Sequence, residues 1–303
     1  MHSRYEHHGL VWVDLESPTQ QEVAAVAAEF DLDHFVAEEL LSPSTKPHTE
    51  MRERYIYLVL HFPALRHTHT SREQEIDFVI GRNFILTTHY DTIDPMHKFS
   101  KVFEVNSTLD ENAFGDHAGY IFFSMLKKLY KAVDHEIDYI SRQLAVMEES
   151  IFSGHEVAMV ESISRVARDL LNLRQTIEPH RDVLRDFEST GTTFFGSDFM
   201  PFLRALSNDY YRVHNHVSRR TEFLHELRET NKSLLSTKQN ETMRVLTIMA
   251  LLTFPLSLFV SIFDINAVYN PIIGLPYDFW IIVFIVLTAG ISMLMYFKRK
   301  KWL

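Results

Sequence analysis

The chain of 303 residues contains no cysteine, which excludes disulfide bridges and metal sites built on thiolates. Its formal net charge is -10 at pH 7, and this acidic balance argues against nucleic acid as a partner. The first ten residues lack the apolar core of a signal peptide and the Arg- and Ser-rich pattern of a transit peptide. The sequence also lacks a GxxxxGK[ST] phosphate-binding loop and an HExxH motif. We therefore expect neither an ATP-driven pump nor an enzyme.

Glycine is absent from residues 200–263, and Pro201 and Pro255 are the only prolines there. Apolar residues recur in this stretch at steps of three and four, which is typical of one face of a helix that packs against another helix. The repeating positions are Leu206, Tyr210, Val213, Val217, Thr221, Leu224, Leu227, Asn231 and Leu234. The sequence thus predicts one long helix from about residue 198 to residue 263.

Charge is absent from the end of this helix. Residues 245–263 (VLTIMALLTFPLSLFVSIF) carry none, and as a helix they extend about 28 Å, close to the hydrocarbon thickness of a bilayer. A second apolar run follows at 279–297 (FWIIVFIVLTAGISMLMYF). A buried helix of a soluble protein is the alternative for the first run, but two such runs favour a membrane protein with two spans.

The loop between the runs, residues 264–278, has no Lys or Arg. Lys238 and Arg244 precede the first run, and four basic residues at 298–301 follow the second. By the positive-inside rule, both ends of the chain face the cytoplasm and the loop faces outward. We therefore expect a multi-pass protein of the cell's inner membrane whose soluble part remains inside.

Strand and helix patterns share the first 115 residues, which predicts an α/β domain there. Strands are expected at 10–15 and 55–62, a hairpin at 75–81 and 83–89, and short helices at 22–30, 34–41 and 94–105. Residues 116–244 read as a helical bundle: one helix from about 117 to 152, a second over 156–188 that Pro179 bends or divides, a loop at 191–197, and the long helix. The remaining segments are a first span at 245–263, an outer loop at 264–278, a second span at 279–297 and a basic tail at 298–303.

Histidine is abundant, with 17 residues. His214 and His216 are two apart, so their rings do not share a helical face. Scattered exposed histidines and a regulatory metal or pH sensor both remain open as interpretations.

Three stretches resemble the CorA family of divalent-cation channels, which includes the ZntB zinc transporters. They are EIDFVIGRNFILTTH at 75–89, NETMRVLTIMALLTFPLSLFVSIF at 240–263 and YFKRKKWL at 296–303. The resemblance implies an α+β cytoplasmic domain followed by long helices and two C-terminal transmembrane helices. It further implies a funnel-shaped homopentamer in the lipid bilayer, with the first span of each subunit lining a central pore. A divalent cation would be the substrate and a candidate regulator, with no separate cofactor.

The family's signature Gly-Met-Asn after the first span corresponds here to Asp264, Ile265 and Asn266. By resemblance these residues form the pore mouth, and Asn266 would bind the ion through its water shell. A ring of Asp264 would concentrate cations, or would hold a more readily dehydrated ion such as zinc, cobalt or nickel. Alternatively, Asp264 caps the span or faces outer water. The family's Met-Pro-Glu stretch is also missing from the loop, so the preferred ion stays open.

One stripe of residues along the first span corresponds, by resemblance, to the face that the family turns toward its pore. Its members are Asn240, Met243, Leu246 or Thr247, Ala250, Phe254, Ser257 and Ser261. Rings of Met243 and Leu246 would gate by excluding water, and Phe254 would narrow the bore. The serine hydroxyls suit a hydrated ion. Packing against lipid or another helix is the alternative for the apolar members.

Two further sets of residues have roles by resemblance. Lys298, Arg299, Lys300 and Lys301 would form a basic collar, although binding of anionic lipid or positive-inside anchoring explains them equally well. Asp198 and Asp209 are candidates for a regulatory metal site, whereas Ala205 stands where the family often has Asp. A membrane homologue that senses ions without conducting them is the alternative function.

Overall fold

The structure, a computed structural model, describes residues 2–64, 73–108, 115–263, 272–274 and 276–300. The chain divides into two compact units, Met1–Arg228 and Glu229–Leu303. The α/β layers and most of the helical bundle therefore pack as one unit, and the division between the two units falls inside the long helix.

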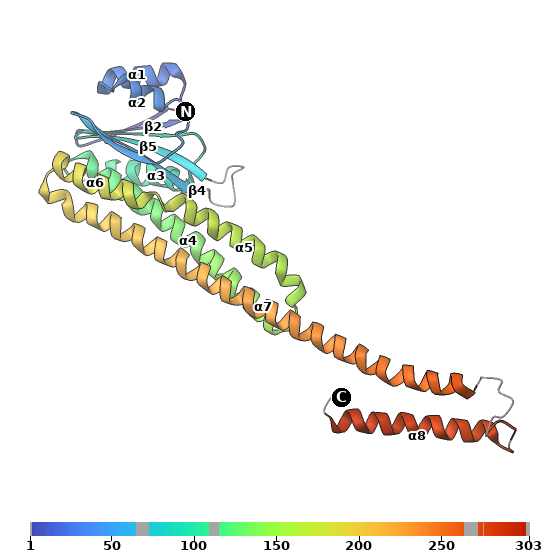
Figure 1. Ribbon diagram of the computed structural model, residues 1–303. Helices are drawn as coiled ribbons and strands as arrows, with labels where there is room; N and C mark the ends of the chain where they lie inside the picture. Colours follow the sequence, from blue (N-terminus) through green and yellow to red (C-terminus); the bar gives the residue numbers. More distant parts are fainter. Residues whose placement is uncertain (1, 65–72, 109–114, 264–271, 275, 301–303) are drawn as a thin grey trace. The chain divides into compact units, whose positions relative to one another are not determined.

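A mixed sheet of six strands forms the centre of the first unit (Figure 1). The strands are β1 (His2–His7), β2 (Leu10–Glu16), β3 (His48–Met51), β4 (Tyr55–Pro63), β5 (Glu73–Gly81) and β6 (Phe84–His89), in the order β1-β2-β6-β5-β4-β3. Among the strands in the described residues, β2 and β6 pair in parallel and the other neighbours pair antiparallel. The predicted strands are confirmed, including the β5–β6 hairpin. The sequence reading missed β1 and β3, because these two edge strands have a single neighbour each and few apolar residues.

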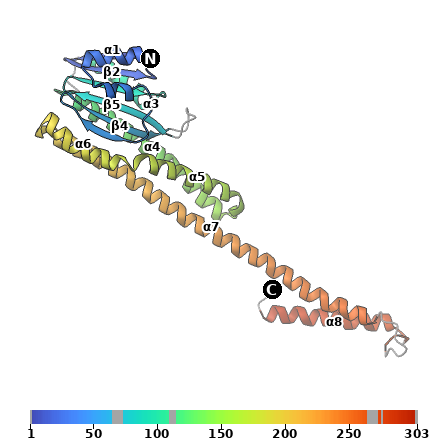
Figure 2. The ribbon, with the colours of Figure 1, turned by 45° about the horizontal axis from the view of Figure 1, so that its top comes forward.

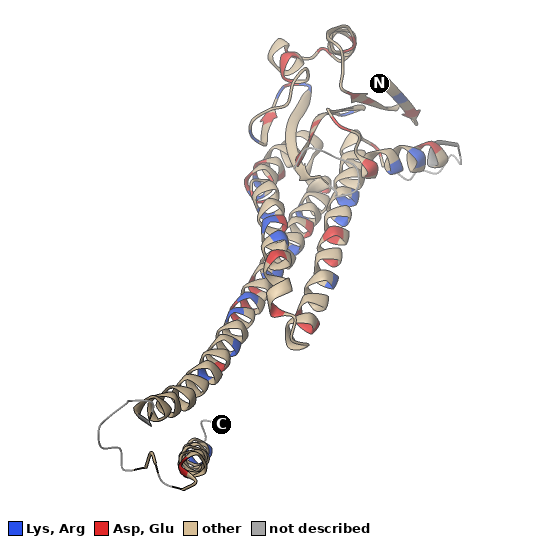
Figure 3. Ribbon diagram, turned by 90° about the vertical axis from the view of Figure 1, so that its right-hand side faces the viewer, with Lys and Arg blue, Asp and Glu red and all other residues tan. Residues whose placement is uncertain are grey.

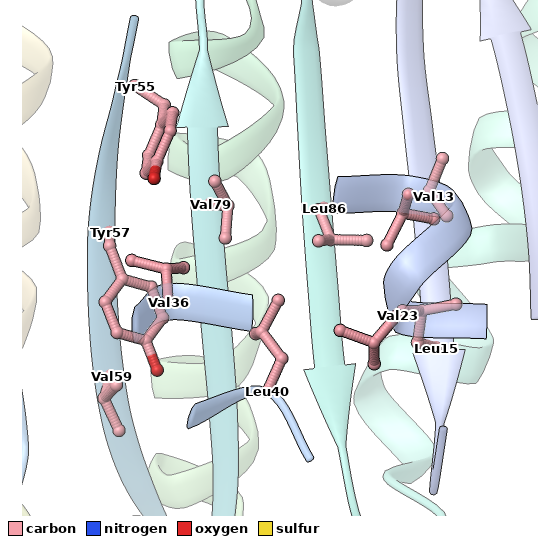
Figure 4. Packing of buried hydrophobic residues seen from close by; sticks show 11 residues of the cluster. Val13, Leu15, Val23, Val36, Leu40, Tyr55, Tyr57, Val59, Val79 and Leu86 are labelled. Atoms are coloured by element: carbon pink, nitrogen blue, oxygen red, sulfur yellow. The ribbon is translucent and has the colours of Figure 1, made fainter. Parts of the chain in front are cut away.

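Helices α1 (Gln20–Phe30) and α2 (His34–Glu39) cover one face of this sheet (Figure 2). Thr19 caps α1 together with Glu22 in a reciprocal capping box. The core under the two helices is apolar, and Val23, Val36 and Leu40 pack there on side chains from β2, β4, β5 and β6 (Figure 4). Burial of this face accounts for the apolar character of the strands.

On the other face lie α3 (Asp94–Thr108), α4 (Ala118–Phe152), α5 (Glu156–Ile177) and α6 (His180–Phe195). Apolar residues at steps of three and four in the sequence predict one buried face along α4. Every member is buried: Leu126, Leu129, Val133, Ile137, Ile140, Leu144, Met147 and Ile151. The same spacing predicts an inward face of α5 at Val160, Ile163, Val166, Leu170, Leu173 and Ile177. All of these are buried except Val160, which is 49% exposed. Phe122 of α4 contacts Phe78 of β5 with ring centroids 5.1 Å apart, which joins the bundle to the sheet.

Two boundaries differ from the prediction. Residues 156–188 form two helices that meet at Pro179, the residue that the sequence reading identified as a bend or boundary. The expected loop at 191–197 is wrong, because α6 continues through Gly191 to Phe195. A Cβ on Gly191 would lie 3.1 Å from Leu203, so glycine serves here for close packing against the next helix. The chain turns only at Gly196, with φ of 102°, and the short 3-10 helix η1 (Ser197–Phe199) follows.

Helix α7 (Met200–Phe263) is continuous over 64 residues and is about 96 Å long. Its predicted face is buried in the first unit at Leu206, Tyr210, Val213, Val217, Leu224 and Leu227. Thr221, also predicted to lie on this face, is exposed. The last turns of α7 lack charged residues, in contrast to the preceding turns, where Lys and Arg are blue and Asp and Glu are red (Figure 3). Helix α8 (Asp278–Arg299) contains the second apolar run. Both helices are long and apolar enough to span a membrane.

Candidate functional site

The candidate site is the charge-free end of α7, inside the second unit. All eight residues of the predicted stripe are exposed in the single chain: Asn240, Met243, Leu246, Thr247, Ala250, Phe254, Ser257 and Ser261. Exposure is 58% for Met243, 56% for Leu246 and 75% for Phe254. These side chains are therefore available to a lumen, to lipid or to another copy of the chain.

Helix α8 distinguishes the sides of α7. Ile248 is buried, Leu252 and Leu256 are half-buried, and Gly290 of α8 lies against Leu256, where an added Cβ would be 3.6 Å from its Cδ1. Successive helical residues are rotated by about 100°, so the predicted stripe falls on the side of α7 opposite to this contact, with Asn240 and Thr247 at its margin. The small residue on α8 permits close approach of the two helices.

The hydroxyl groups of the stripe are partly engaged by the helix itself. Thr247 Oγ1 donates to the carbonyl oxygen of Met243 at 2.8 Å, and Ser261 Oγ donates to that of Ser257 at 2.9 Å. Each hydroxyl proton is used within the helix, which leaves oxygen lone pairs able to accept hydrogen bonds from the water shell of a cation.

Pro255 lies within α7 and cannot donate a backbone hydrogen bond to the carbonyl of Leu251. The helix nevertheless continues through it to Phe263. The freed carbonyl is a polar group within an otherwise apolar segment.

The predicted pore-mouth residues Asp264, Ile265 and Asn266 lie outside the described residues, as does Lys301. Asp278, the last residue of the predicted outer loop, is the first residue of α8 in the structure. Its carboxylate accepts hydrogen bonds from the backbone N–H groups of Gly274 at 3.2 Å and Phe279 at 2.7 Å. Asp278 thus links the described part of the outer loop to the first turn of α8, where a negative charge also interacts favourably with the helix dipole.

The remaining residues of the predicted basic collar lie at the C-terminal end of α8. Lys298 and Arg299 belong to its last turn, Lys300 is the C-cap, and all three are exposed. Cations near a helix C-terminus interact favourably with its dipole.

The two candidate regulatory aspartates have different surroundings. Asp198 is exposed in η1, whereas Asp209 is buried in α7 and forms an ion pair with Arg212 at 2.8 Å. Arg212 also contacts Asp134 of α4 at 3.2 Å. Within the described ranges, no group of three or more His, Asp or Glu residues is arranged to hold a metal ion. Asp209 is thus engaged in a protein ion pair, and Asp198 is the more accessible of the two.

The sequence reading missed a buried polar cluster between β4, β5 and α2. Glu75 of β5 accepts hydrogen bonds from the backbone N–H of Ser44 at 2.8 Å and lies 2.9 Å from Nε2 of His61. Asp77, two residues along the same strand face, accepts from the hydroxyl of Tyr90 at 3.3 Å. Burial, and secondarily the charge of Glu75, raise the pKa of Asp77 well above its usual range. The alternation of strand residues places both carboxyls on one face, but the sequence does not show that α2 covers them.

A soluble α+β unit followed by a continuous helix and a second apolar helix defines a class of membrane protein with two C-terminal spans. The chain belongs to the family described as CorA-like Mg²⁺ transporter protein, which matches residues 7–299.

Two relatives illustrate the similarity in sequence. The cobalt/magnesium transport protein CorA of Thermotoga maritima is 24% identical over 294 residues, which cover 96% of this chain and 83% of that protein. The putative metal ion transporter YfjQ of Bacillus subtilis is 22% identical, with 96% and 89% covered.

Solved structures show the same fold. The complete CorA magnesium transporter of Methanocaldococcus jannaschii has a TM-score of 0.85 at 18% identity and covers 99% of this chain and 93% of its own. The full-length CmaX protein has a TM-score of 0.75 at 17% identity, with 97% and 89% covered. The ZntB cytoplasmic domain of Vibrio parahaemolyticus has a TM-score of 0.61 at 10% identity over 75% of this chain and 88% of its own. The predicted fold class is confirmed.

Proposed function

We propose that the protein passes divalent metal cations across the inner membrane through the central pore of a homopentamer. Membership of the CorA-like family carries this proposal, since relatives along nearly the whole chain are named as cobalt and magnesium transport proteins. A subunit with two spans cannot enclose an aqueous path, so conduction requires several copies. A cation is then the substrate, and the protein acts as a transporter without a resident cofactor.

The side of α7 opposite α8 supports the assignment of the pore-lining residues. In an assembly whose α8 helices lie outside, the stripe from Asn240 to Ser261 faces the axis. Rings of Met243 and Leu246 then form an apolar constriction that closes the path by excluding water. Phe254 narrows the bore further along, and Ser257 and Ser261 offer hydroxyl oxygens to a hydrated ion.

The mouth follows at Asp264, Ile265 and Asn266. Magnesium gives up its water reluctantly and prefers octahedral oxygen coordination, so a ring of Asn266 carboxamides binds the ion through its water shell. A ring of Asp264 carboxylates raises the local cation concentration and favours divalent over monovalent ions.

The basic residues fit the orientation of the proposed assembly. With no Lys or Arg at 264–278, and with Lys298, Arg299, Lys300 and Lys301 after the second span, the loop faces outward and both ends are cytoplasmic. The basic residues then form a collar at the cytoplasmic surface, next to anionic lipid head groups. In η1, directly before α7, Asp198 remains the candidate for a regulatory cation.

Flux through purified protein tests the function. The full-length protein is reconstituted into liposomes that contain a dye for Mg²⁺, and an inside-negative potential is applied. We expect Mg²⁺ entry above that of protein-free liposomes, and abolition of entry by Asn266→Ala. The same assay with Co²⁺, Ni²⁺ and Zn²⁺ ranks the ions.

The second candidate function is a sensor that does not conduct. It predicts that none of the four ions enters the liposomes, even when the reconstituted oligomer is intact. The altered signature at Asp264 and Ile265 motivates this candidate. Native mass spectrometry of the same sample measures the number of subunits in the oligomer. Any number other than five would contradict the pentamer.

A further inference from the structure

A groove between α3 and α4, on the first unit, is separate from the proposed ion path. It has a volume of about 540 Å³, within the range of small-molecule sites. Helix α4 contributes Lys128, Lys131, His135, Tyr139 and Arg142, at steps of three and four that place them on one face, and α3 contributes Lys98.

The groove is basic although the chain is acidic overall. Four permanent cations, Lys98, Lys128, Lys131 and Arg142, line it beside two acids, Asp94 and Glu136. Among the described residues, Arg142 forms no ion pair with a carboxylate, in contrast to Arg165, Arg174, Arg204 and Arg212, and none of the lysines of the unit forms one. Uncompensated positive charge in a concave surface attracts anions and focuses their local concentration.

Lys128 is held at the inner wall of the groove. Its Nζ lies over the ring of Phe99 from α3, 5.0 Å from the centroid, and the side chain is half-buried. Burial, and secondarily the charge of Lys131, lower the pKa of Lys128. Two neighbouring ammonium groups without an acidic partner repel each other, and a bound anion would relieve this repulsion.

At the other end of the groove lie two planar groups, the Tyr139 ring and the Arg142 guanidinium. The guanidinium of Arg142 lies over the ring of Tyr139, 5.9 Å from its centroid. Tyr139 is about 16 Å along α4 from Lys128, so the cationic and aromatic ends are within the span of one extended ligand. Arginine and tyrosine planes are surfaces on which a planar heterocycle stacks.

We propose that this groove binds a nucleoside polyphosphate, with the phosphates on Lys98, Lys128 and Lys131 and the base beside Tyr139 and Arg142. Lysine ammonium groups bind phosphate oxygens as point charges, and charge-assisted hydrogen bonds are about twice as strong as neutral ones. The ring plane accounts for a nucleotide in preference to inorganic polyphosphate.

Isothermal titration calorimetry tests the assignment with the full-length protein in detergent and EDTA, so that metal ions do not contribute. The probes are ATP, AMP and tripolyphosphate. We expect saturable ATP binding that is roughly tenfold tighter than AMP binding and that weakens when salt is raised from about 50 to 200 mM. Absence of saturable ATP binding overturns the proposal.

Two matched double variants separate the groove from general surface charge. Lys128→Gln with Lys131→Gln should weaken ATP binding by roughly tenfold or more. Lys101→Gln with Lys127→Gln removes the same charge from α3 and α4 outside the groove and should leave the affinity within about twofold. Equal losses in the two double variants overturn the site.

Tyr139→Ala tests the base. It should reduce ATP affinity to that of tripolyphosphate and leave tripolyphosphate binding unchanged. Equal affinity of the wild type for ATP and tripolyphosphate overturns the nucleotide assignment. Binding is measured without flux, so failure here and failure of the proposed transport function are distinguishable.

Discussion

His180 of α6 donates a hydrogen bond from Nε2 to the backbone carbonyl oxygen of His61 in β4, across 2.7 Å. Its other nitrogen, Nδ1, accepts a hydrogen bond from the hydroxyl of Tyr130 in α4 at 2.8 Å. One buried neutral imidazole thus ties two helices to the sheet. Burial lowers its pKa from 6.5 to about 4.

This ring makes the stability of the first unit depend on pH. Between pH 6.5 and 4, His180 is protonated in the unfolded chain but stays neutral in the folded chain. The free energy of unfolding therefore decreases as pH falls through this window. The whole loss is about 3 kcal/mol. The measurement is urea unfolding at pH 7 and pH 5. His180→Gln keeps a donor for His61 but does not titrate, so it should be less stable at pH 7 and should lose less on acidification. Identical losses in variant and wild type would exclude His180 as the titrating group.

Asp77 should have the opposite pH dependence. Its folded pKa is raised by burial and by Glu75, so above the usual carboxyl pKa the unfolded chain ionises while the folded chain retains the proton. This contribution to stability is therefore lost as pH rises toward the folded pKa. Asp77→Asn is neutral at every pH and should stabilise the protein, with a larger gain at pH 8 than at pH 5, measured by urea unfolding.

Asp134 supplies the control for this substitution, because it forms an ion pair with Arg212 at 3.2 Å. Asp134→Asn should destabilise at pH 8, by less than about 1 kcal/mol because the pair is partly exposed. A gain at Asp77 that does not change with pH would contradict the retained proton.

Phe254 should limit the rate of ion passage if the stripe opposite α8 faces the pore. Phe254→Ala widens the bore and should raise Mg²⁺ flux in the liposome assay by several-fold. Phe259→Ala removes the same volume about 140° around α7, on the side of Ile248 and Leu252 and away from the predicted stripe, and should leave the rate nearly unchanged. The reverse ranking would place the pore on the other side of the helix.

Asp264 should govern the supply of cations to the mouth. Asp264→Asn is expected to reduce Mg²⁺ flux by roughly tenfold at low ionic strength and by less at high ionic strength, because salt screens the carboxylate ring. Asp278→Asn removes a charge from the start of α8 and preserves the side-chain shape, so its effect on flux should be small. Unchanged flux in Asp264→Asn would remove this residue from the mechanism.

Glycine and proline show where local patterns suffice. Pro179 correctly indicated a boundary, because a proline removes a hydrogen bond of any helix that runs through it. Gly191 did not end its helix, because the absence of a Cβ there admits Leu203 of α7. The sequence contains no signal for that approach, which depends on a residue of the following helix.

The edge strands show a second limit. β4 and β5 were predictable because they are buried on both faces and read as apolar runs. β1 and β3 pair with one neighbour and keep polar residues, so only the presence of β2 and β4 beside them identifies them as strands.

The sequence by itself determined the two spans, the long α7 and the buried stripe of α4, because an extended run or stripe of apolar residues must leave water whatever its partner is. Only the tertiary structure decided that His180 is neutral, that Asp77 keeps its proton, and which side of α7 is covered by α8. A pKa and a buried face depend on groups that are distant in the chain, and folding alone brings those groups together.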